Sequence, residues 1–236
     1  MEPTSLRCEI TRDPASIRQA RALRHRVFVA ERGAAPGIEP GLEGAGSDDD
    51  CEHAVVTDAA RPGAAPIAAA RLRFGTGWTE REFDLSPVIR RGLRIAEVGR
   101  ICVDPAHRDG LAATMLLAGV VGALRRAGAE VLVGAASFPG RDPAPHLEAL
   151  RALRASALAP EGWRPMACGP GALRVEGPAP RCAMIGVPSL IKAYLRAGAW
   201  VGEGACVDAA FNVVDVCVVL DMNCLRLPRA MRAAAA

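Results

Sequence analysis

The sequence predicts a mixed α/β fold, with a central β-sheet that carries helices on its faces. Three observations support this. Apolar runs of strand length alternate with segments of helical periodicity. Gly and Pro gather between them. Half of the 236 residues are hydrophobic, which is enough for a sizeable core. The predicted order is strand, helix, hairpin, strand, helix, strand, two helices and a last strand, which indicates a mixed sheet.

The length fits one domain over residues 1–236, with a core at about 8–155 and a C-terminal part at about 156–225 that completes the sheet. The net charge of +3 is too small to indicate nucleic-acid binding, and no basic, aromatic motif supports it. No run reaches the roughly 18 apolar residues of a membrane span. We expect a cytoplasmic protein. Peripheral contact with the inner face of a membrane is an alternative that the sequence does not exclude.

Eight cysteines are present, and none forms a C-x-x-C pair. We expect reduced, buried thiols, as in other cytoplasmic proteins. A metal site at Cys51 and His53 is the alternative, but two clustered ligands fall short of the four that structural zinc uses. The sequence therefore predicts no metal.

The N-terminal part begins with a short strand at residues 8–12. Asp13 and Pro14 then provide an N-cap and a first helical residue. Apolar residues recur at helical spacing from Ile17 to Ala30, which predicts one continuous helix. Most of its arginines are expected to be solvated.

A loop and a hairpin follow. Residues 33–50 are rich in Gly, Pro and Ala and end in three aspartates, which indicates a loop. Strands are predicted at 53–58 and 67–74. Arg71 and Arg73 share one face of the second strand because side chains alternate along a strand.

The central stretch is residues 94–110. An almost unbroken apolar run at 95–103 predicts a buried strand, and only Glu97 and Arg100 interrupt it. Burying an unpaired charge costs several kcal/mol, so such residues are paired or functional. In a regular strand the two would lie on opposite faces, and a bulge near Gly99 would bring them closer to one side.

A basic turn, His107 to Gly110, then leads into a helix that extends to about residue 127. A helix N-terminus with a basic, glycine-containing turn suits a phosphate group. We interpret the stretch as a carboxylate base beside a phosphate-carrying thioester. A purely structural Glu–Arg pair is the alternative.

The remaining elements follow from the same patterns, with Gly128 as a helix C-cap. In order, they are a strand at 131–136, a turn at 137–140, a helix at 145–153, a long connection at 160–180, a helix at 188–196 and a strand at 211–220.

Six blocks then carry a resemblance to the GCN5-related N-acetyltransferase (GNAT) superfamily. They are residues 23–31, 48–53, 82–87, 97–103, 136–140 and 190–196. Within that superfamily the chain resembles the L-ornithine N(alpha)-acyltransferases, which make lyso-ornithine lipid from acyl carrier protein thioesters. It also resembles acyl-homoserine-lactone synthases, and six positions match theirs: Arg24, Phe28, Asp48, Arg71, Glu97 and Arg100. The resemblance implies the GNAT fold, a mostly antiparallel twisted sheet with helices on both faces.

The chain also departs from these families. Relatives have a second Asp where Ala45 stands, and Glu43 or Asp49 is a possible substitute. Leu111 replaces the first Gly of the coenzyme A signature. That change suits an acyl donor with one phosphate, namely the phosphopantetheine arm of a carrier protein. It does not exclude coenzyme A as the donor. The Trp of lactone synthases is absent, because residues 33–35 are Gly-Ala-Ala.

The resemblance implies attack of an amino-acid α-amine on a fatty acyl thioester. Glu97 would be the base, directly or through water, and Arg100 the second catalytic residue. Backbone N–H groups beside Gly99 would hold the oxyanion. Arg108, Asp109 and Gly110 would bind the phosphopantetheine phosphate.

Other positions would bind substrate. Arg24, Arg71 and Arg100 would grip a carboxylate or clamp the loop around Asp48, and Asp48 would bind the ornithine cation or lie in a solvated loop. Phe28 belongs to the matching substrate block, and Ser137 and Tyr194 are candidates to assist the leaving thiol. No resident cofactor is implied. The acidic carrier protein would dock on basic residues, for which the candidates are Arg90, Arg91, Arg94, Arg125 and Arg126.

Two other functions are considered. Another acceptor, such as glycine, tyrosine or homoserine, or an acyl-coenzyme A donor would keep the same chemistry. A non-catalytic acyl-carrier or lipid-binding module on the same fold is a different class, and the presence of both Glu97 and Arg100 speaks against it.

Overall fold

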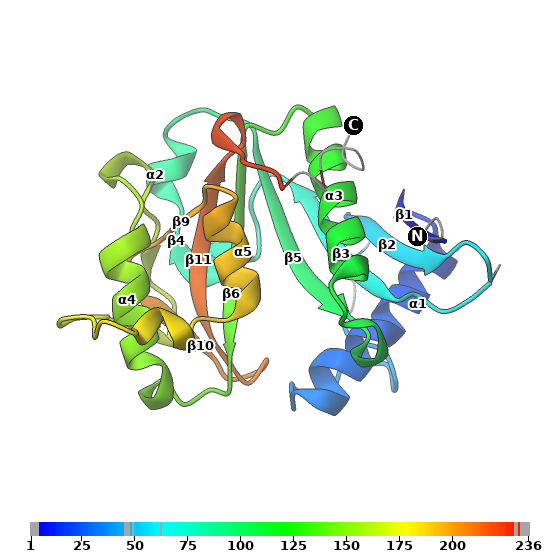
Figure 1. The fold of residues 1–236 in the computed structure, drawn as a ribbon, viewed down its shortest axis with the longest axis horizontal. Helices are drawn as coiled ribbons and strands as arrows, with labels where there is room; N and C mark the ends of the chain where they lie inside the picture. Colours follow the sequence, from blue (N-terminus) through cyan, green and yellow to red (C-terminus); the bar gives the residue numbers. More distant parts are fainter. Residues whose placement is uncertain (1–4, 45–47, 49, 62, 229–230, 232–236) are drawn as a thin grey trace. The chain divides into compact units, whose positions relative to one another are not determined.

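The computed structural model describes residues 5–44, 48, 50–61, 63–228 and 231. The chain forms two compact units (Figure 1). The first unit holds residues 1–73, 98–128 and 227–236, and the second holds 74–97 and 129–226. The central strand β5 (Ile95–Val103) contributes its first three residues to the second unit and its last six to the first.

The first unit contains the strands β1 (Leu6–Thr11), β2 (Glu52–Asp58) and β3 (Ala68–Phe74), in the order β1-β2-β3-β5. The hairpin predicted from the sequence is confirmed, since β2 and β3 pair antiparallel. β1 pairs antiparallel with β2.

Helices cover both faces of these strands. The helix α1 (Pro14–Arg24) packs Ala20 and Leu23 against Val55 of β2. Cys8 of β1 pairs with Val56 and therefore points to the other face. There it meets α3 (Leu111–Arg126), which is drawn in front of the strands, with α1 behind them (Figure 1).

The predicted N-terminal helix changes character at its C-terminal end. From His25 to Glu31 the backbone forms a π-helical segment, η1, instead of continuing as an α-helix. A π turn widens the helix, and such turns are frequent at functional sites. Apolar periodicity does not reveal the change, because Val27 still faces the core.

The second unit is built on β6 (Val131–Pro139) and β11 (Val213–Asp221), which pair antiparallel along their whole length. The first residues of β5 pair parallel with β6, from Ile95–Val131 to Glu97–Val133. On the other side, the order continues from β11 to β10 (Ala205–Asp208) and β8 (Ala172–Leu173).

Further short strands complete this unit. β9 (Trp200–Val201) also pairs with β11, and β4 (Phe83–Asp84) forms a separate ribbon with β7 (Met166–Ala167). The sequence pattern did not predict these strands or β10, because two to four residues are too few to show a period.

Both faces of the second unit are covered. The short helix α2 (Ser86–Ile89) and the segment before it pack Phe83 and Val88 against Val133. On the opposite face lies α5 (Ser189–Arg196), in contact with β6 (Figure 1). The helix α4 (Leu147–Ala157) contacts β9.

Two predictions require correction. Residues 137–139 do not form a turn, because β6 continues to Pro139 while β11 supplies a partner for every residue. The cysteines are all free, but only four are buried. Cys168, Cys182 and Cys224 are exposed, since they lie outside the regular core elements.

Gly171 precedes β8 at a point where the chain passes very close to β10. A Cβ atom at this position would lie 2.2 Å from the backbone oxygen of Val207, and backbone cannot move aside cheaply. We expect Gly171→Ala to lower the free energy of unfolding by about 1–3 kcal/mol. Gly162→Ala, where the nearest atom is 3.6 Å away, is the control and should stay within about 0.5 kcal/mol. Equal denaturation midpoints for the two variants would contradict the prediction.

Candidate active site

Glu97 is a buried carboxylate on β5, with 1% of its surface exposed. It accepts hydrogen bonds from the backbone N–H of Trp78, at 3.0 Å, and from both the backbone N–H and the hydroxyl of Thr79. The short helix η2 (Thr79–Arg81) therefore fixes the position of the carboxylate. A fixed carboxylate in a buried position can accept a proton from an adjacent amine.

Arg100 adopts a left-handed backbone conformation, with φ of +55°. A non-glycine residue in this region costs on the order of 1–3 kcal/mol, and such residues gather at functional sites. The left-handed residue is Arg100, next to Gly99, and the bulge expected near Gly99 stays a prediction. Its Nε donates to Glu43 Oε1 at 3.0 Å, and 28% of its side chain is exposed.

Three arginines and two carboxylates form a network in the first unit, which we call the arginine–carboxylate network. Asp48 lies between Arg24, at 2.5 Å, and Arg71, at 2.9 Å. Glu43 binds Arg24 Nε at 2.6 Å as well as Arg100. All are buried except Arg100, and the network has one more positive than negative charge.

Charge pairing dominates the electrostatics of Asp48. Burial raises the pKa of its carboxyl, but hydrogen bonds and charge from Arg24 and Arg71 outweigh burial and lower the pKa from 3.8 to about 2. Burial lowers the pKa of the Arg71 guanidinium, and the nearby charge of Arg100 lowers it further. Asp48 is thus ionised and neutralised within the protein.

The contacts of the network bear on the two alternatives left open by the sequence. Arg24 and Arg71 clamp the loop at Asp48, and both oxygens of that carboxylate are engaged. The Asp48 side chain is therefore buried and not solvated, and binding of the ornithine cation by Asp48 stays an untested prediction. Glu43, one of the two possible substitutes for the second acid, pairs with Arg24 and Arg100. Ala45 and Asp49 lie outside the described residues.

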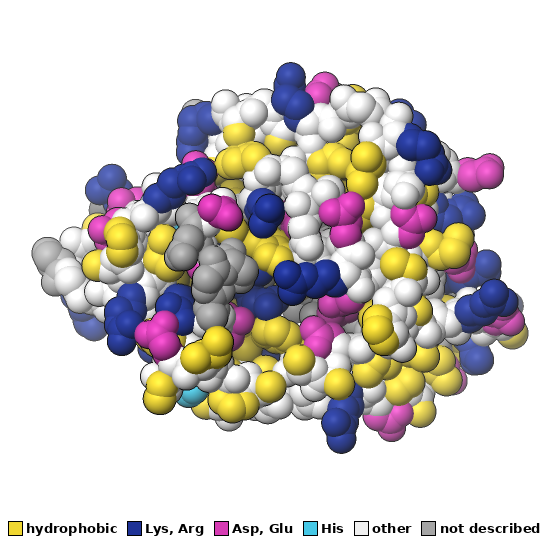
Figure 2. All heavy atoms as spheres, turned by 180° about the vertical axis from the view of Figure 1, so that it is seen from behind, with side chains coloured by type: hydrophobic (Ala, Val, Ile, Leu, Met, Phe, Trp, Pro, Cys, Tyr) yellow, Lys and Arg dark blue, Asp and Glu magenta, His cyan; other side chains and the backbone are white. Residues whose placement is uncertain are grey.

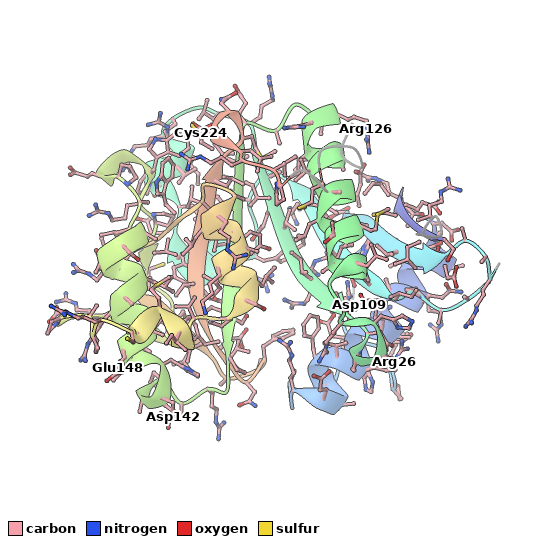
Figure 3. All side chains as sticks on the ribbon, viewed as in Figure 1. Arg26, Asp109, Arg126, Asp142, Glu148 and Cys224 are labelled. Atoms are coloured by element: carbon pink, nitrogen blue, oxygen red, sulfur yellow. The ribbon has the colours of Figure 1, made fainter. Side chains whose placement is uncertain are left out.

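The turn before α3 places Arg108, Asp109 and Gly110 together. Gly110 is the N-cap, with φ of +98°, and Asp109 accepts a hydrogen bond from the backbone N–H of Leu111. Arg108 binds Glu31 through two hydrogen bonds, at 2.7 and 2.6 Å. Figure 3 labels Asp109 at the start of α3 and Arg26 on η1, at the same end of the first unit.

The other predicted substrate residues are spread over both units. Phe28, on η1, packs against the core of the first unit. Ser137, on β6, donates a hydrogen bond to Asp215 Oδ1 at 2.5 Å. Tyr194, on α5, is partly buried, and desolvation raises the pKa of its phenol, which stays protonated at neutral pH. The binding roles of these residues stay predictions.

The proposed docking arginines are part of a mixed surface. Arg91 stacks on the ring of Trp163 at 3.9 Å, and Arg94 pairs with Glu130 at 3.7 Å. In Figure 2, blue and magenta side chains are interspersed on the face shown. A docking role for these arginines stays a prediction.

Among the residues that the structure describes, no cluster of potential metal ligands includes Cys51 or His53. Burial lowers the pKa of the His53 imidazole, and its Nε2 lies 3.4 Å from the backbone oxygen of Asp48. In the same described part of the chain, one cluster of three acidic residues has carboxylate oxygens within 4.8 Å of one another: Glu82, Asp208 and Asp215.

Sequence reasoning missed Glu31 and Asp215, and it named Glu43 only as a possible substitute for a missing acid. Only tertiary contacts show the arginine partners of Glu31 and Glu43. Asp215 had a detectable pattern, since it is the only charge in the apolar run 213–220.

Comparison with known proteins shows the family of this chain. The chain is 37% identical to the L-ornithine N(alpha)-acyltransferase of Rhodobacter capsulatus, over 94% of this chain and 92% of that protein. The chain belongs to the L-ornithine N(alpha)-acyltransferase family. The family member of Rhizobium meliloti is 33% identical, with 93% of this chain and 81% of that protein covered. The family model described as "Acetyltransferase (GNAT) domain" matches residues 23–118 of this chain.

Solved structures support the fold. The CoA-dependent acyl-homoserine lactone synthase BjaI has a TM-score of 0.55 at 15% identity, covering 98% of this chain and 88% of that one. The AHL synthase LasI has a TM-score of 0.54 at 12% identity, covering 94% and 92%. The predicted resemblance and GNAT fold are confirmed, and the family membership makes this chain an N-acyltransferase. None of the described helices is long and apolar enough to cross a membrane.

The arginine–carboxylate network should be essential for stability. Asp48→Asn removes the buried negative charge that lies between Arg24 and Arg71, so we expect a loss of about 3–5 kcal/mol in the free energy of unfolding. Glu39→Gln is the matched control. The Glu39 side chain is 46% exposed and pairs with the exposed Arg18 and with Arg21, which also lies 3.9 Å from Asp48. Its loss leaves Asp48 in place and should cost less than about 1 kcal/mol. Chemical denaturation measures both.

The carboxyl group of Asp48 should make the free energy of unfolding depend on pH in the acid range. The folded pKa of about 2 lies below the unfolded value of 3.8, so the folded state binds fewer protons. The stabilisation, about 2 kcal/mol, is complete above pH 4 and is lost as the pH falls from 4 towards 2. Asp48→Asn should remove this part of the pH dependence. An unchanged slope in the variant would assign the acid sensitivity to other groups.

Proposed function

We propose that this chain transfers a fatty acyl group, including 3-hydroxy acyl groups, from an acyl carrier protein thioester to the α-amine of L-ornithine. The product would be lyso-ornithine lipid. The acceptor comes from the relatives, which are named L-ornithine N(alpha)-acyltransferase. The observation that carries the chemistry is Glu97, a buried carboxylate held by three hydrogen-bond donors.

In the proposed reaction, Glu97 takes a proton from the α-ammonium group of the acceptor. The free amine attacks the thioester carbonyl carbon, and a C–N bond forms. The C–S bond then breaks, and the thiolate leaves with a proton derived from the amine. A carboxylate that is positioned as a general base accelerates such a reaction by about 10²- to 10⁴-fold.

One backbone position and two side chains are the candidates to support the transition state. Gly99 has open space on its side-chain position, since an added Cβ would meet nothing within 4 Å. The thioester oxygen can therefore approach the backbone N–H groups beside Gly99. Tyr194 and Ser137 are the candidates to relay the proton lost by the attacking amine to the leaving thiolate.

Arg100 is the candidate for binding the acceptor carboxylate. It is the partly exposed member of the arginine–carboxylate network, and the network carries one excess positive charge. A guanidinium that substrate can reach binds a carboxylate through two parallel hydrogen bonds. Arg24 and Arg71 then act by holding Asp48 and the loop that carries Glu43.

The donor phosphate is assigned to Arg108 and the first amides of α3, a helix of 16 residues. The partner is an acyl carrier protein, and no resident cofactor is needed for this reaction. The amphiphilic product would place the enzyme at the inner face of the membrane as a peripheral protein. An acyl-coenzyme A donor or another amino-acid acceptor would require the same residue roles.

Glu97→Gln tests the proposed chemistry. The amide keeps the size of the side chain but cannot accept the proton, so kcat should fall by about 10²- to 10⁴-fold. The measurement is mass spectrometry of lipids from cells that express the wild type or the variant. Glu130→Gln, which removes a surface pair with Arg94, is the control and should keep the new N-acyl ornithine.

The outcomes separate the alternatives. An N-acyl derivative of another amino acid, lost in Glu97→Gln, would keep the mechanism and change the acceptor. No new acyl amide from folded wild-type protein would refute acyl transfer and favour a non-catalytic lipid-binding module. Full activity of Glu97→Gln would remove Glu97 as the base.

Arg108→Ala tests the donor site. Loss of a charge-assisted hydrogen bond to phosphate should raise KM for the acyl carrier protein thioester about tenfold, with kcat changed less than about twofold. Arg26→Ala removes a similar exposed ion pair, with Asp104, and should leave KM unchanged. Initial rates with purified thioesters measure this. Equal KM for Arg108→Ala and wild type would exclude the assignment.

A further inference from the structure

The carboxylate of Glu97 is held unequally at its two oxygens. Oε1 accepts hydrogen bonds from both the backbone N–H and the hydroxyl of Thr79, whereas Oε2 accepts one, from the backbone N–H of Trp78 at 3.0 Å. An ionised carboxylate offers about four lone-pair positions, two on each oxygen. Among the donors that the structure describes, Thr79 therefore occupies both positions on Oε1, and one position on Oε2 is left for a further donor.

The segment that carries these donors is tied to β5 at a second point. Gly75 follows β3 and adopts a φ of +102°, and its backbone N–H donates to the backbone oxygen of Ile95 at 2.8 Å. Ile95 lies two residues before Glu97 on the same strand, and both attachments belong to the second unit. The backbone that leads into η2 is therefore fixed against the strand that carries the proposed base.

Thr79 supplies the one side-chain donor of the three. It is 3% exposed, and its branched Cβ restricts rotation about χ1. If its hydroxyl turned away, a buried hydroxyl and a buried carboxylate oxygen would each lack a partner, which is unfavourable. Of the three donors, this hydroxyl is also the one that a substitution can remove while the backbone stays the same.

The other charged and titratable groups around this carboxylate are less directly engaged. The thiol of Cys217, on β11, lies within the electrostatic influence of Glu97 and Glu82, and burial raises its pKa, so it is uncharged over the range in which carboxylates titrate. Glu82 is partly buried, and the charges of η2 itself, Glu80 and Arg81, are exposed and screened by solvent. The printed contacts to the Glu97 oxygens thus come from uncharged donors.

We infer that Thr79 is a positioning residue that directs the proton of the attacking amine to Oε2 of Glu97. This inference rests on the proposed function, in which Glu97 is the base. An N–H bond of the acceptor α-ammonium group breaks and an O–H bond forms at Oε2, while Thr79 continues to donate to Oε1. The electron pair left on nitrogen attacks the thioester, and the proton passes on to the leaving thiolate.

Holding one oxygen with two donors has two consequences. The carboxylate cannot rotate without breaking hydrogen bonds, so Oε2 keeps one orientation towards the acceptor, and such positioning contributes strongly to rate. The hydroxyl also favours the charged form of Glu97, because a hydrogen-bond donor stabilises negative charge. Removal of the hydroxyl should therefore misplace the base and extend its protonation to higher pH.

Thr79→Val tests the inference, because valine keeps the branched shape and the backbone N–H but has no side-chain donor. At neutral pH, kcat should fall about tenfold while KM for ornithine changes less than about twofold. The acid limb of kcat/KM against pH should move up by about one unit, since protonation of Glu97 becomes easier. Initial rates with purified acyl carrier protein thioester across the pH range measure both.

Thr11→Val is the matched control. Thr11 is also buried, and its hydroxyl oxygen accepts a hydrogen bond from the backbone N–H of Asp13 in the first unit. The same substitution there should leave kcat and the acid limb unchanged, even where it lowers the melting temperature. Thr79→Ser keeps the hydroxyl and should retain both wild-type kcat, within about twofold, and the wild-type acid limb.

A second comparison covers the case in which Thr79→Val does not fold. Thr79→Ser and Thr79→Ala both lack the methyl group and differ only in the hydroxyl, so the alanine variant alone should show the lower kcat and the shifted acid limb. Thermal melting checks that each variant is folded. Equal kcat and an equal acid limb in folded Thr79→Val and wild type, or in Thr79→Ala and Thr79→Ser where Thr79→Val is unfolded, overturn the inference. A lower melting temperature as the sole effect would give Thr79 a purely structural role.

The same assays separate this inference from the proposed function. If folded wild type forms no acyl amide, or if Glu97→Gln keeps full activity, the proposed role of Glu97 fails and this inference fails with it. If Glu97→Gln is impaired while Thr79→Val keeps the wild-type kcat and acid limb, Glu97 stays the base and the role of Thr79 alone is refuted.

Discussion

The pairing of buried arginines with buried carboxylates is the constraint on which the first unit depends. Arg24 and Arg71 are almost fully buried, and each would be very costly without Asp48. The pairs also tie a Gly- and Pro-rich loop to α1 and β3, elements that are far apart in sequence. An apolar core of similar volume would stabilise the unit as well, but it could not present an arginine such as Arg100 at its edge.

Charge in the second unit serves a different purpose. Glu97 and Asp215 are each buried, and both accept hydrogen bonds from uncharged donors: Trp78 and Thr79 for Glu97, and Ser137 for Asp215. Such donors hold a carboxylate in place without neutralising it by a salt bridge. This arrangement suits Glu97 as a group that receives a proton from a substrate. The first unit thus pairs its buried carboxylates with arginine, whereas Glu97 in the second unit is held by backbone N–H groups and a hydroxyl.

Several parts of the site followed from the sequence because their physics is local. Glu97 and Arg100 stood out as charges in an apolar run, and the turn before α3 stood out as a glycine-containing helix start. The hairpin and the long helix followed from periodicity. Glu43 was predicted only as a substitute for a missing acid, and its two arginine partners lie 19 and 57 residues away in sequence. No local pattern can specify contacts at that range.

The sequence by itself determined the fold class, the central strand and the family, because alternating apolar patterns and six ordered blocks are properties of the chain. Only the tertiary structure decided which arginines neutralise which carboxylates and which acids gather together. It extended β6 through Ser137, since β11 gave each of those residues a partner, and so brought Ser137 against Asp215. It also placed the left-handed backbone at Arg100 rather than at the neighbouring glycine. Both outcomes depend on pairing between distant segments, and the free energy of such pairing cannot be derived from either segment alone.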